Sequence, residues 1–128
     1  MSNGRKPTGL LRIVILLVGI HSLMLGIAML VSPRGFSWFV GFPASDTIFF
    51  PSQAGAFLIA LGICYLLALR DRALVWTILV SKAVAVVFLF AHYLFLDAPP
   101  SVLAAGIGDL VMLVATLGAM SLERQAPA

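Results

Sequence analysis

The chain has 128 residues, of which 62% are hydrophobic and 10% charged, and its mean hydropathy is +1.12. Soluble domains are nearer half apolar and a quarter charged, so this composition excludes a soluble enzyme, a disordered tail and a nucleic-acid-binding module. The net charge of +3 comes from basic residues that stand mostly at the ends of apolar runs, so we expect these residues to set membrane topology and expect no nucleic-acid partner.

Four apolar stretches are long enough to cross a bilayer, at residues 10–31, 52–69, 73–96 and 101–121. A hydrocarbon core about 30 Å thick needs about 20 residues of helix, and lipid tolerates no unpaired backbone. The first stretch is too long for the apolar part of a secretory signal, so we interpret it as a helix of the mature protein. The sequence therefore predicts an all-α integral membrane fold, with one four-helix membrane domain over residues 1–128.

The connection over residues 32–50 is rich in aromatic residues, including Phe36, Trp38, Phe39 and Phe42. It is too apolar for a free loop and too short for another span. We expect an interfacial segment with Trp38 at headgroup level. Two interpretations stay open, a lid over a cavity that opens outward and an anchor on the membrane surface.

Basic residues near the spans are strongly asymmetric between the two sides of the predicted bundle. One side holds Arg5, Lys6, Arg12, Arg70, Arg72 and Arg124, and the other holds Arg34. Lys and Arg are enriched in cytoplasmic loops. We therefore expect a multi-pass protein of the bacterial inner membrane with both termini in the cytoplasm.

Small residues spaced four apart predict where helices approach closely, because lipid provides no hydrophobic drive between helices. The pairs are Ser22 and Gly26, Ala56 and Ala60, Ala104 and Gly108, and Ala115 and Ala119. The third stretch has no such pair and carries bulky residues from Val84 to Phe90, so part of it is expected to face lipid or a partner.

Three ionisable residues lie deep inside the predicted spans: His21, Lys82 and Asp109. At 1.5 Å per residue they fall at about 16, 13 and 18 Å from the cytoplasmic side, close to one plane near the bilayer middle. Isolated charges at this depth cost about 2.5–3.5 kcal/mol each, so we expect an ion pair between Lys82 and Asp109. The pair is either a structural staple between two helices or, with His21, a proton-responsive or substrate-anchoring site.

A second polar group is expected near the outer surface, where Gln53 opens the second span and His92 and Tyr93 close the third. These side chains either line an outer mouth that leads toward Asp109 or are simply wetted by lipid headgroups.

Soluble-enzyme chemistry is not visible in the sequence. Cys64 is the single cysteine, so no intrachain disulfide is possible, and the two histidines are too far apart along their spans to share a metal. There is no phosphate-binding loop and no nucleophile–base set. We expect no catalytic residues, no metal site and no cofactor, and we expect a protein that is not an enzyme.

Several of these features together resemble the DoxX-like family of small bacterial four-helix membrane proteins. They are the short basic N-terminus, the first span ending at Pro33, the aromatic segment after it, the run from Gly55 to Leu66, the mid-span Lys82, and Gly108-Asp109-Leu110. The resemblance implies a four-helix fold and an accessory role in a membrane complex, in some members redox- or quinone-linked. It carries over no catalytic residue.

Two functions are therefore expected. The first is an accessory or assembly subunit of a larger, redox- or quinone-linked membrane complex. The alternative is a small transporter or a lipid- or quinone-binding protein that uses His21, Lys82 and Asp109. The expected partners are membrane lipids, another membrane protein or a second copy of the chain, and a quinone or other lipophile.

Overall fold

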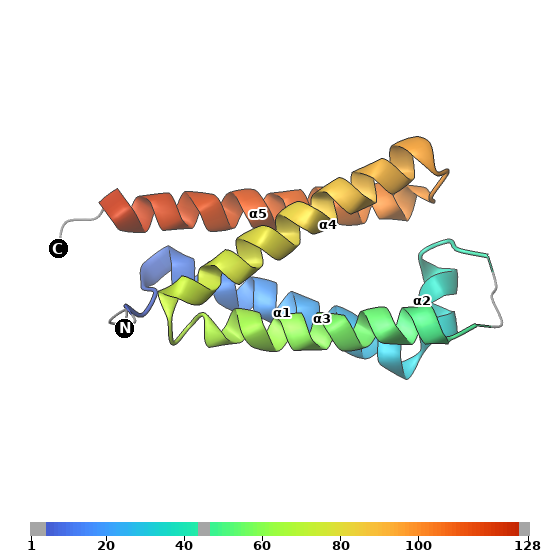
Figure 1. The fold of residues 1–128 in the computed structure, drawn as a ribbon, viewed down its shortest axis with the longest axis horizontal. Helices are drawn as coiled ribbons and strands as arrows, with labels where there is room; N and C mark the ends of the chain where they lie inside the picture. The colour runs from blue at the N-terminus through green and yellow to red at the C-terminus, as the bar shows by residue number, and fades with distance from the viewer. Residues whose placement is uncertain (1–4, 44–46, 126–128) are drawn as a thin grey trace.

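The computed structural model describes residues 5–43 and 47–125, which form helices joined by short connections (Figure 1). In chain order the elements are α1 (Gly9–Val31), α2 (Pro33–Phe39), α3 (Phe49–Leu67), the 3₁₀ turn η1 (Arg72–Leu74), α4 (Val75–Phe95) and α5 (Pro100–Gln125). Within these residues α1, α3, α4 with η1, and α5 are long and apolar enough to cross a membrane. Many of their large apolar side chains are exposed, as lipid-facing ones must be. The chain is therefore a multi-pass membrane protein with the predicted all-α fold.

Two helix boundaries differ from the predicted ones by three or four residues, and the others by two or fewer. The second span was expected to begin at residue 52 with Pro51 before it, but α3 begins at Phe49 and Pro51 lies in its first turn. Proline is tolerated there because the first four N–H groups of a helix have no carbonyl partner within it. The last span was expected to end at residue 121, but α5 continues to Gln125, because Glu123 is held by contacts described below.

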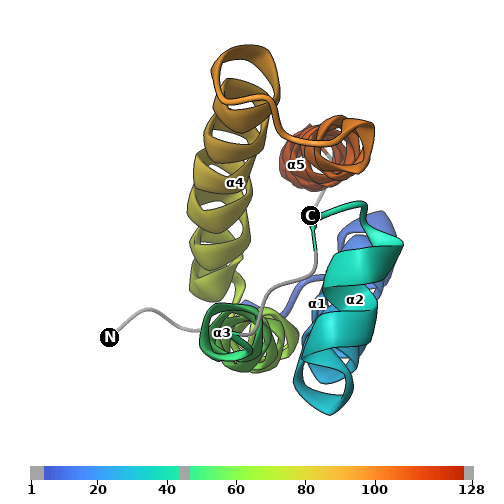
Figure 2. The ribbon, with the colours of Figure 1, turned by 90° about the vertical axis from the view of Figure 1, so that its right-hand side faces the viewer.

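The four long helices form two pairs. α1 packs along α3, α4 packs along α5, and α1 also contacts α5 between the pairs. α4 contacts α3 only sparsely, and it leaves α3 as it runs away from η1 (Figures 1 and 2). We call the end that holds η1 and the described chain ends the terminal end, and the opposite end the α2 end. The contact between α3 and α4 is therefore smaller than those of α1 with α3, α4 with α5 and α1 with α5.

The bulky core lies in the terminal half of the bundle. Its buried members are Leu11, Ile15, Val18, Tyr65, Ala68, Val75, Ile78, Leu79, Ala119 and Met120. Toward the α2 end the buried positions are mostly small or polar: Ser22, Gly26, Gly55, Gly62, Lys82 and Gly106. Bulky packing therefore stabilises the terminal half, and backbone contact and polar groups hold the other half.

α1 and α3 meet backbone to backbone. A Cβ atom on Gly26 would lie 2.7 Å from the carbonyl oxygen of Gly55, and one on Gly55 would lie 2.8 Å from that of Gly26. The expected contact at Ser22 and Gly26 is confirmed, because both are buried. The expected contact at Ala56 and Ala60 is wrong, because both are exposed. On α3 the contact face passes instead through its glycines, which are spaced two turns apart.

The small residues predicted on α5 also differ from the observed contact face. Three of them are exposed or face open space: Ala104, Gly108 and Ala115. Ala119 is buried as expected, and Gly106, which the spacing rule missed, packs against α4. The reason is that Asp109 points to α4. Residues three and seven positions away from it lie on the same face of α5 and therefore turn the same way.

The terminal end is tied together by a group of polar contacts that we call the terminal clamp, consisting of Thr8, Arg72 and Glu123. The backbone N–H and the hydroxyl of Thr8 donate to Oε1 of Glu123, at 3.1 and 3.2 Å. Nε of Arg72 lies 3.4 Å from Oε2 of the same carboxylate. The backbone N–H of Arg72 also donates to the carbonyl of Arg5, at 3.1 Å. The clamp thus joins the segment before α1, the α3–α4 turn and the end of α5.

The expected aromatic segment after α1 contains a short helix, α2, at the end of the bundle (Figure 2). Its Trp38 and Phe39 side chains are 79% and 80% exposed, which suits an interfacial location. The hydroxyl of Ser101 on α5 donates to the carbonyl of Val40. The segment therefore reaches from α1 across to α5. Residues 44–46 of this connection lie outside the described residues.

Candidate functional site

Lys82 and Asp109 form an ion pair between α4 and α5. Nζ of Lys82 donates to Oδ1 of Asp109 at 2.7 Å, and the two side chains are 6% and 15% exposed. Both residues lie near the middle of helices that are long enough to cross a membrane. The pair predicted from the rarity of charge is therefore confirmed as a contact. Each charge relieves the cost of burying the other.

A tyrosine and a serine lie beside the pair, and sequence analysis missed both. The hydroxyl of Ser81 donates to the carbonyl of Thr77 at 2.6 Å, and it also contacts the hydroxyl of Tyr65 on α3. A serine hydroxyl has one proton, so Tyr65 is the donor in the contact between the two. Nζ of Lys82 lies 6.0 Å from the centre of the Tyr65 ring, within the range of a cation–π interaction.

His21 brings α1 into the same region. Its side chain is exposed, and the fields of Lys82 and Asp109 both act on it. Among the described residues His21 makes no hydrogen bond or ion pair with Lys82 or Asp109, and unlike Lys82 it is not buried, so the predicted site of all three residues stays a prediction. We call His21, Tyr65, Ser81, Lys82 and Asp109 the polar cluster. It draws on all four long helices.

The polar cluster retains unused hydrogen-bonding groups. Lys82 carries three N–H donors, of which one is given to Asp109, and the carboxylate of Asp109 retains acceptor positions. His21 can donate or accept through either ring nitrogen. A small polar group such as a carbonyl, a hydroxyl or a carboxylate matches this set of donors and acceptors. The described residues contain no group of three His, Cys, Asp or Glu side chains placed to hold a metal ion.

The predicted outer mouth of Gln53, His92 and Tyr93 does not form as one group. Gln53 is exposed at the start of α3, where α3 and α4 stand apart (Figure 1). Nδ1 of His92 is 2.8 Å from the carbonyl of Phe88 on its own helix. The rings of the two residues are tilted by 35° to each other, with their centres 3.9 Å apart. Tyr93 is half-buried on α4. Divergence of the two helices separates residues that a parallel bundle would bring together.

Two further hydroxyl groups are buried near the polar cluster. Thr116 donates to the carbonyl of Met112 on α5 at 2.7 Å, and its side chain is fully buried. Ser22 on α1 is also buried, and its hydroxyl has no hydrogen-bond partner among the described residues. The hydrogen bond of Thr116 could have been predicted from the sequence, because threonine within a helix commonly donates to the carbonyl four residues earlier.

Comparison of the chain with protein-family models, with curated proteins and with solved structures finds no match. The resemblance to the DoxX-like family therefore stays a prediction, and the function is argued from the geometry of the polar cluster.

Proposed function

We propose that this protein binds the polar head of a lipophilic molecule, a lipid or a quinone, at the polar cluster. One observation carries the proposal: the exposed, ionisable His21 lies in the field of a buried ion pair, part-way along a membrane-crossing helix. An ionisable side chain at this depth is costly unless it faces a polar group or a water-filled space. A bound polar head that contacts His21 removes this cost.

The arrangement of the helices supports entry of such a ligand from the bilayer. α3 and α4 contact each other sparsely, and the bulky core ends before the α2 half of the bundle. An apolar tail lying between α3 and α4 would remain in contact with lipid while its head reaches Lys82 or His21. Ligand sites between the helices of bundles are common.

The second candidate function is that of an accessory or assembly subunit in a larger membrane complex. The exposed face of α4 favours it, because Val84, Val87 and Phe88 form a bulky apolar surface without a partner among the described residues. The DoxX-like resemblance implies the same role. In this case a helix of another protein, rather than a lipophile, covers His21.

We further propose that the protein resides in the bacterial inner membrane with both termini in the cytoplasm. The terminal end carries the basic residues Arg5, Lys6, Arg12, Arg70, Arg72 and Arg124, against Arg34 at the α2 end. This asymmetry matches the enrichment of Lys and Arg in cytoplasmic segments.

The test is native mass spectrometry of the protein purified in a mild detergent, with co-purifying lipids identified and a decyl-substituted benzoquinone added as a probe. We expect one tightly bound lipophile in the wild type. In His21→Leu its binding should fall about tenfold, which corresponds to the loss of one hydrogen bond. The matched control is His92→Leu, which removes the other histidine and should leave binding unchanged.

The outcomes separate the two functions. A stoichiometric protein partner without a bound lipophile would establish the accessory role and exclude lipophile binding. Equal loss of lipophile in both histidine variants would show that the ligand does not contact the polar cluster, and would contradict the proposal.

A further inference from the structure

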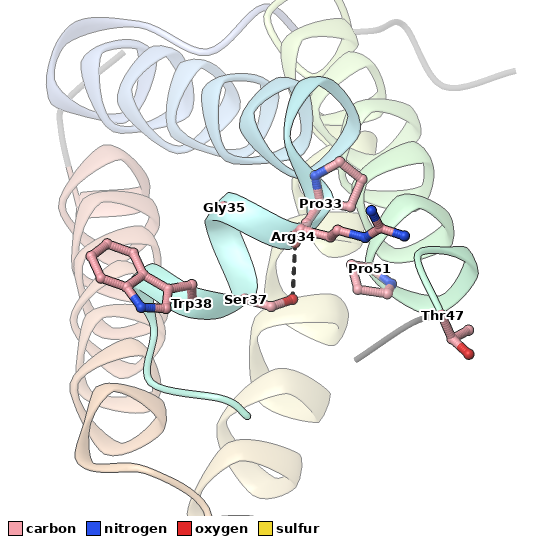
Figure 3. A pocket seen from close by; sticks show the side chains of 7 residues that line it. All are labelled: Pro33, Arg34, Gly35, Ser37, Trp38, Thr47 and Pro51. Atoms are coloured by element: carbon pink, nitrogen blue, oxygen red, sulfur yellow. Dashed lines mark hydrogen bonds between the residues drawn. The ribbon is translucent and has the colours of Figure 1, made fainter. Parts of the chain in front are cut away.

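A pocket of about 320 Å³ lies at the α2 end, between α2 and the start of α3 (Figure 3). It is lined by Pro33, Arg34, Gly35, Ser37, Trp38, Thr47 and Pro51. The Arg34 side chain extends from α2 toward Pro51 and Thr47, whereas Trp38 lies on the other side of α2. The hydroxyl of Ser37 donates to the carbonyl of Pro33 at 2.9 Å, which fixes one wall of the pocket within α2.

Arg34 has an unusual charge environment. Of the eight Lys and Arg residues in the sequence, it is the one at the α2 end of the bundle. Among the described residues it has no ion-pair partner, in contrast to Arg72 and Lys82, which are paired. Asp97 follows α4 at this end, and Asp46 lies outside the described residues. Arg34 is therefore a cation exposed at a pocket and unpaired by any described acid.

The position of α2 places this pocket at the depth of lipid headgroups. α1 ends at Val31 and α3 begins at Phe49, so α2 lies where two membrane-crossing helices end. The exposed Trp38 is typical of the interface between hydrocarbon and water. The mostly apolar wall, with Pro33 and Pro51, suits the glycerol region of a lipid beside its charged group.

We propose that the Arg34 pocket binds a phosphate group, and that a phospholipid headgroup of the adjacent leaflet supplies it. A guanidinium offers a planar fork of N–H donors that matches two phosphate oxygens at once. The fixed walls hold that fork beside the interface, where phosphates are concentrated. This site is separate from the polar cluster and does not depend on the function proposed for it.

The experiment measures the binding of defined lipids to the full chain in an uncharged maltoside detergent by native mass spectrometry. The probes are phosphatidylglycerol, diacylglycerol with the same acyl chains but no phosphate, and inorganic phosphate. The variants are Arg34→Gln and, as a matched control, Arg12→Gln, which removes an exposed cation at the terminal end of α1.

We expect the wild type to bind at least one phosphatidylglycerol more tightly than diacylglycerol. Arg34→Gln should weaken that binding about tenfold, since a charge-assisted bidentate contact is lost, and Arg12→Gln should keep it. A similar dependence of inorganic phosphate binding on Arg34 would also support the phosphate site and would add solution phosphate as a source.

Two results would overturn the proposal. One is equal binding of phosphatidylglycerol by the wild type and Arg34→Gln. The other is equal binding of phosphatidylglycerol and diacylglycerol by the wild type, because the site would then recognise acyl chains and not phosphate. Thermal unfolding of Arg34→Gln without lipid checks that the variant is folded, and the exposed position of Arg34 makes loss of the fold unexpected.

Discussion

Lys82 and Asp109 lie on the faces of α4 and α5 that turn toward each other, and a contact of 2.7 Å joins them. Removing one partner leaves a charge in a buried, membrane-depth position with no counter-charge. Removing both replaces the pair by apolar groups, which buried sites often accept without loss of stability. Substituting one partner or both therefore separates the structural role of the pair from a role in binding.

We predict that Lys82→Met and Asp109→Leu each lower the free energy of unfolding by about 3 kcal/mol, because each leaves an unpaired buried charge. The free energy of unfolding of the double variant should be within about 1 kcal/mol of the wild-type value. The measurement is unfolding by a denaturing detergent in mixed micelles. Additive losses in the double variant would show that the two side chains do not act as a pair.

The same double variant also informs the proposed function. If it is stable and has lost the bound lipophile, the pair takes part in binding. If it is stable and keeps the lipophile with full affinity, the pair is a structural staple.

At the scale of the elements, α1 and α3 are joined through glycines, and α4 and α5 through the ion pair and the packing of Gly106 against Leu89 and Phe90. Close backbone approach between α1 and α3 brings many main-chain and side-chain atoms into contact, which is the main attraction available between helices in lipid. The Gly26–Gly55 contact is the one in which backbone atoms lie closest to the positions that a Cβ would take.

We predict that Gly26→Ala destabilises the protein by about 1–3 kcal/mol, because the new methyl group meets backbone atoms and α1 and α3 must move apart. The matched control is Gly108→Ala on α5, where a Cβ meets nothing within 4 Å. That variant should be neutral or more stable by up to about 1 kcal/mol, since alanine favours helix. Equal effects at the two positions, in the same unfolding assay, would argue against tight packing of α1 on α3.

At the scale of the whole molecule, charge and packing divide the protein into two unlike ends. The terminal end holds the terminal clamp, the bulky core and most of the basic residues. The α2 end holds exposed aromatic side chains and the Arg34 pocket. The charge difference predicts which end faces the cytoplasm.

We predict that green fluorescent protein fused after Ala128 is fluorescent and that alkaline phosphatase fused there is inactive, because both termini are proposed to be cytoplasmic. Fusions to a chain truncated after Ala98, in the α4–α5 connection, should give the opposite result. Active phosphatase at the C-terminus would reverse the proposed orientation, and activity at neither position would indicate that the chain does not insert as four spans.

The long helices could be predicted from the sequence because hydropathy and backbone pairing in lipid depend on short stretches of chain. The contact of Lys82 with Asp109 could be predicted because charge is rare in the spans. The contact of Tyr65 with Ser81 could not, because neither residue is unusual in a membrane helix. The packing glycines Gly55, Gly62 and Gly106 were missed because their faces depend on how helices distant in sequence pair. The helix α2 was missed because its seven residues carry no clear helical period.

The terminal clamp has a consequence for the two leaflets of the bilayer. Because Glu123 joins the segment before α1 to the α3–α4 turn, the two helix pairs are tied together at the terminal end, and any hinge motion between them would be centred there. Any change in the angle between α3 and α4 is then largest in the leaflet at the α2 end. Lateral pressure from lipid acyl chains in that leaflet would oppose separation of α3 and α4. Pressure in the other leaflet would act close to the hinge and would have little effect on the angle between the two helices. If the proposed ligand enters between α3 and α4, its access to the polar cluster would therefore depend on the lipid packing of one leaflet.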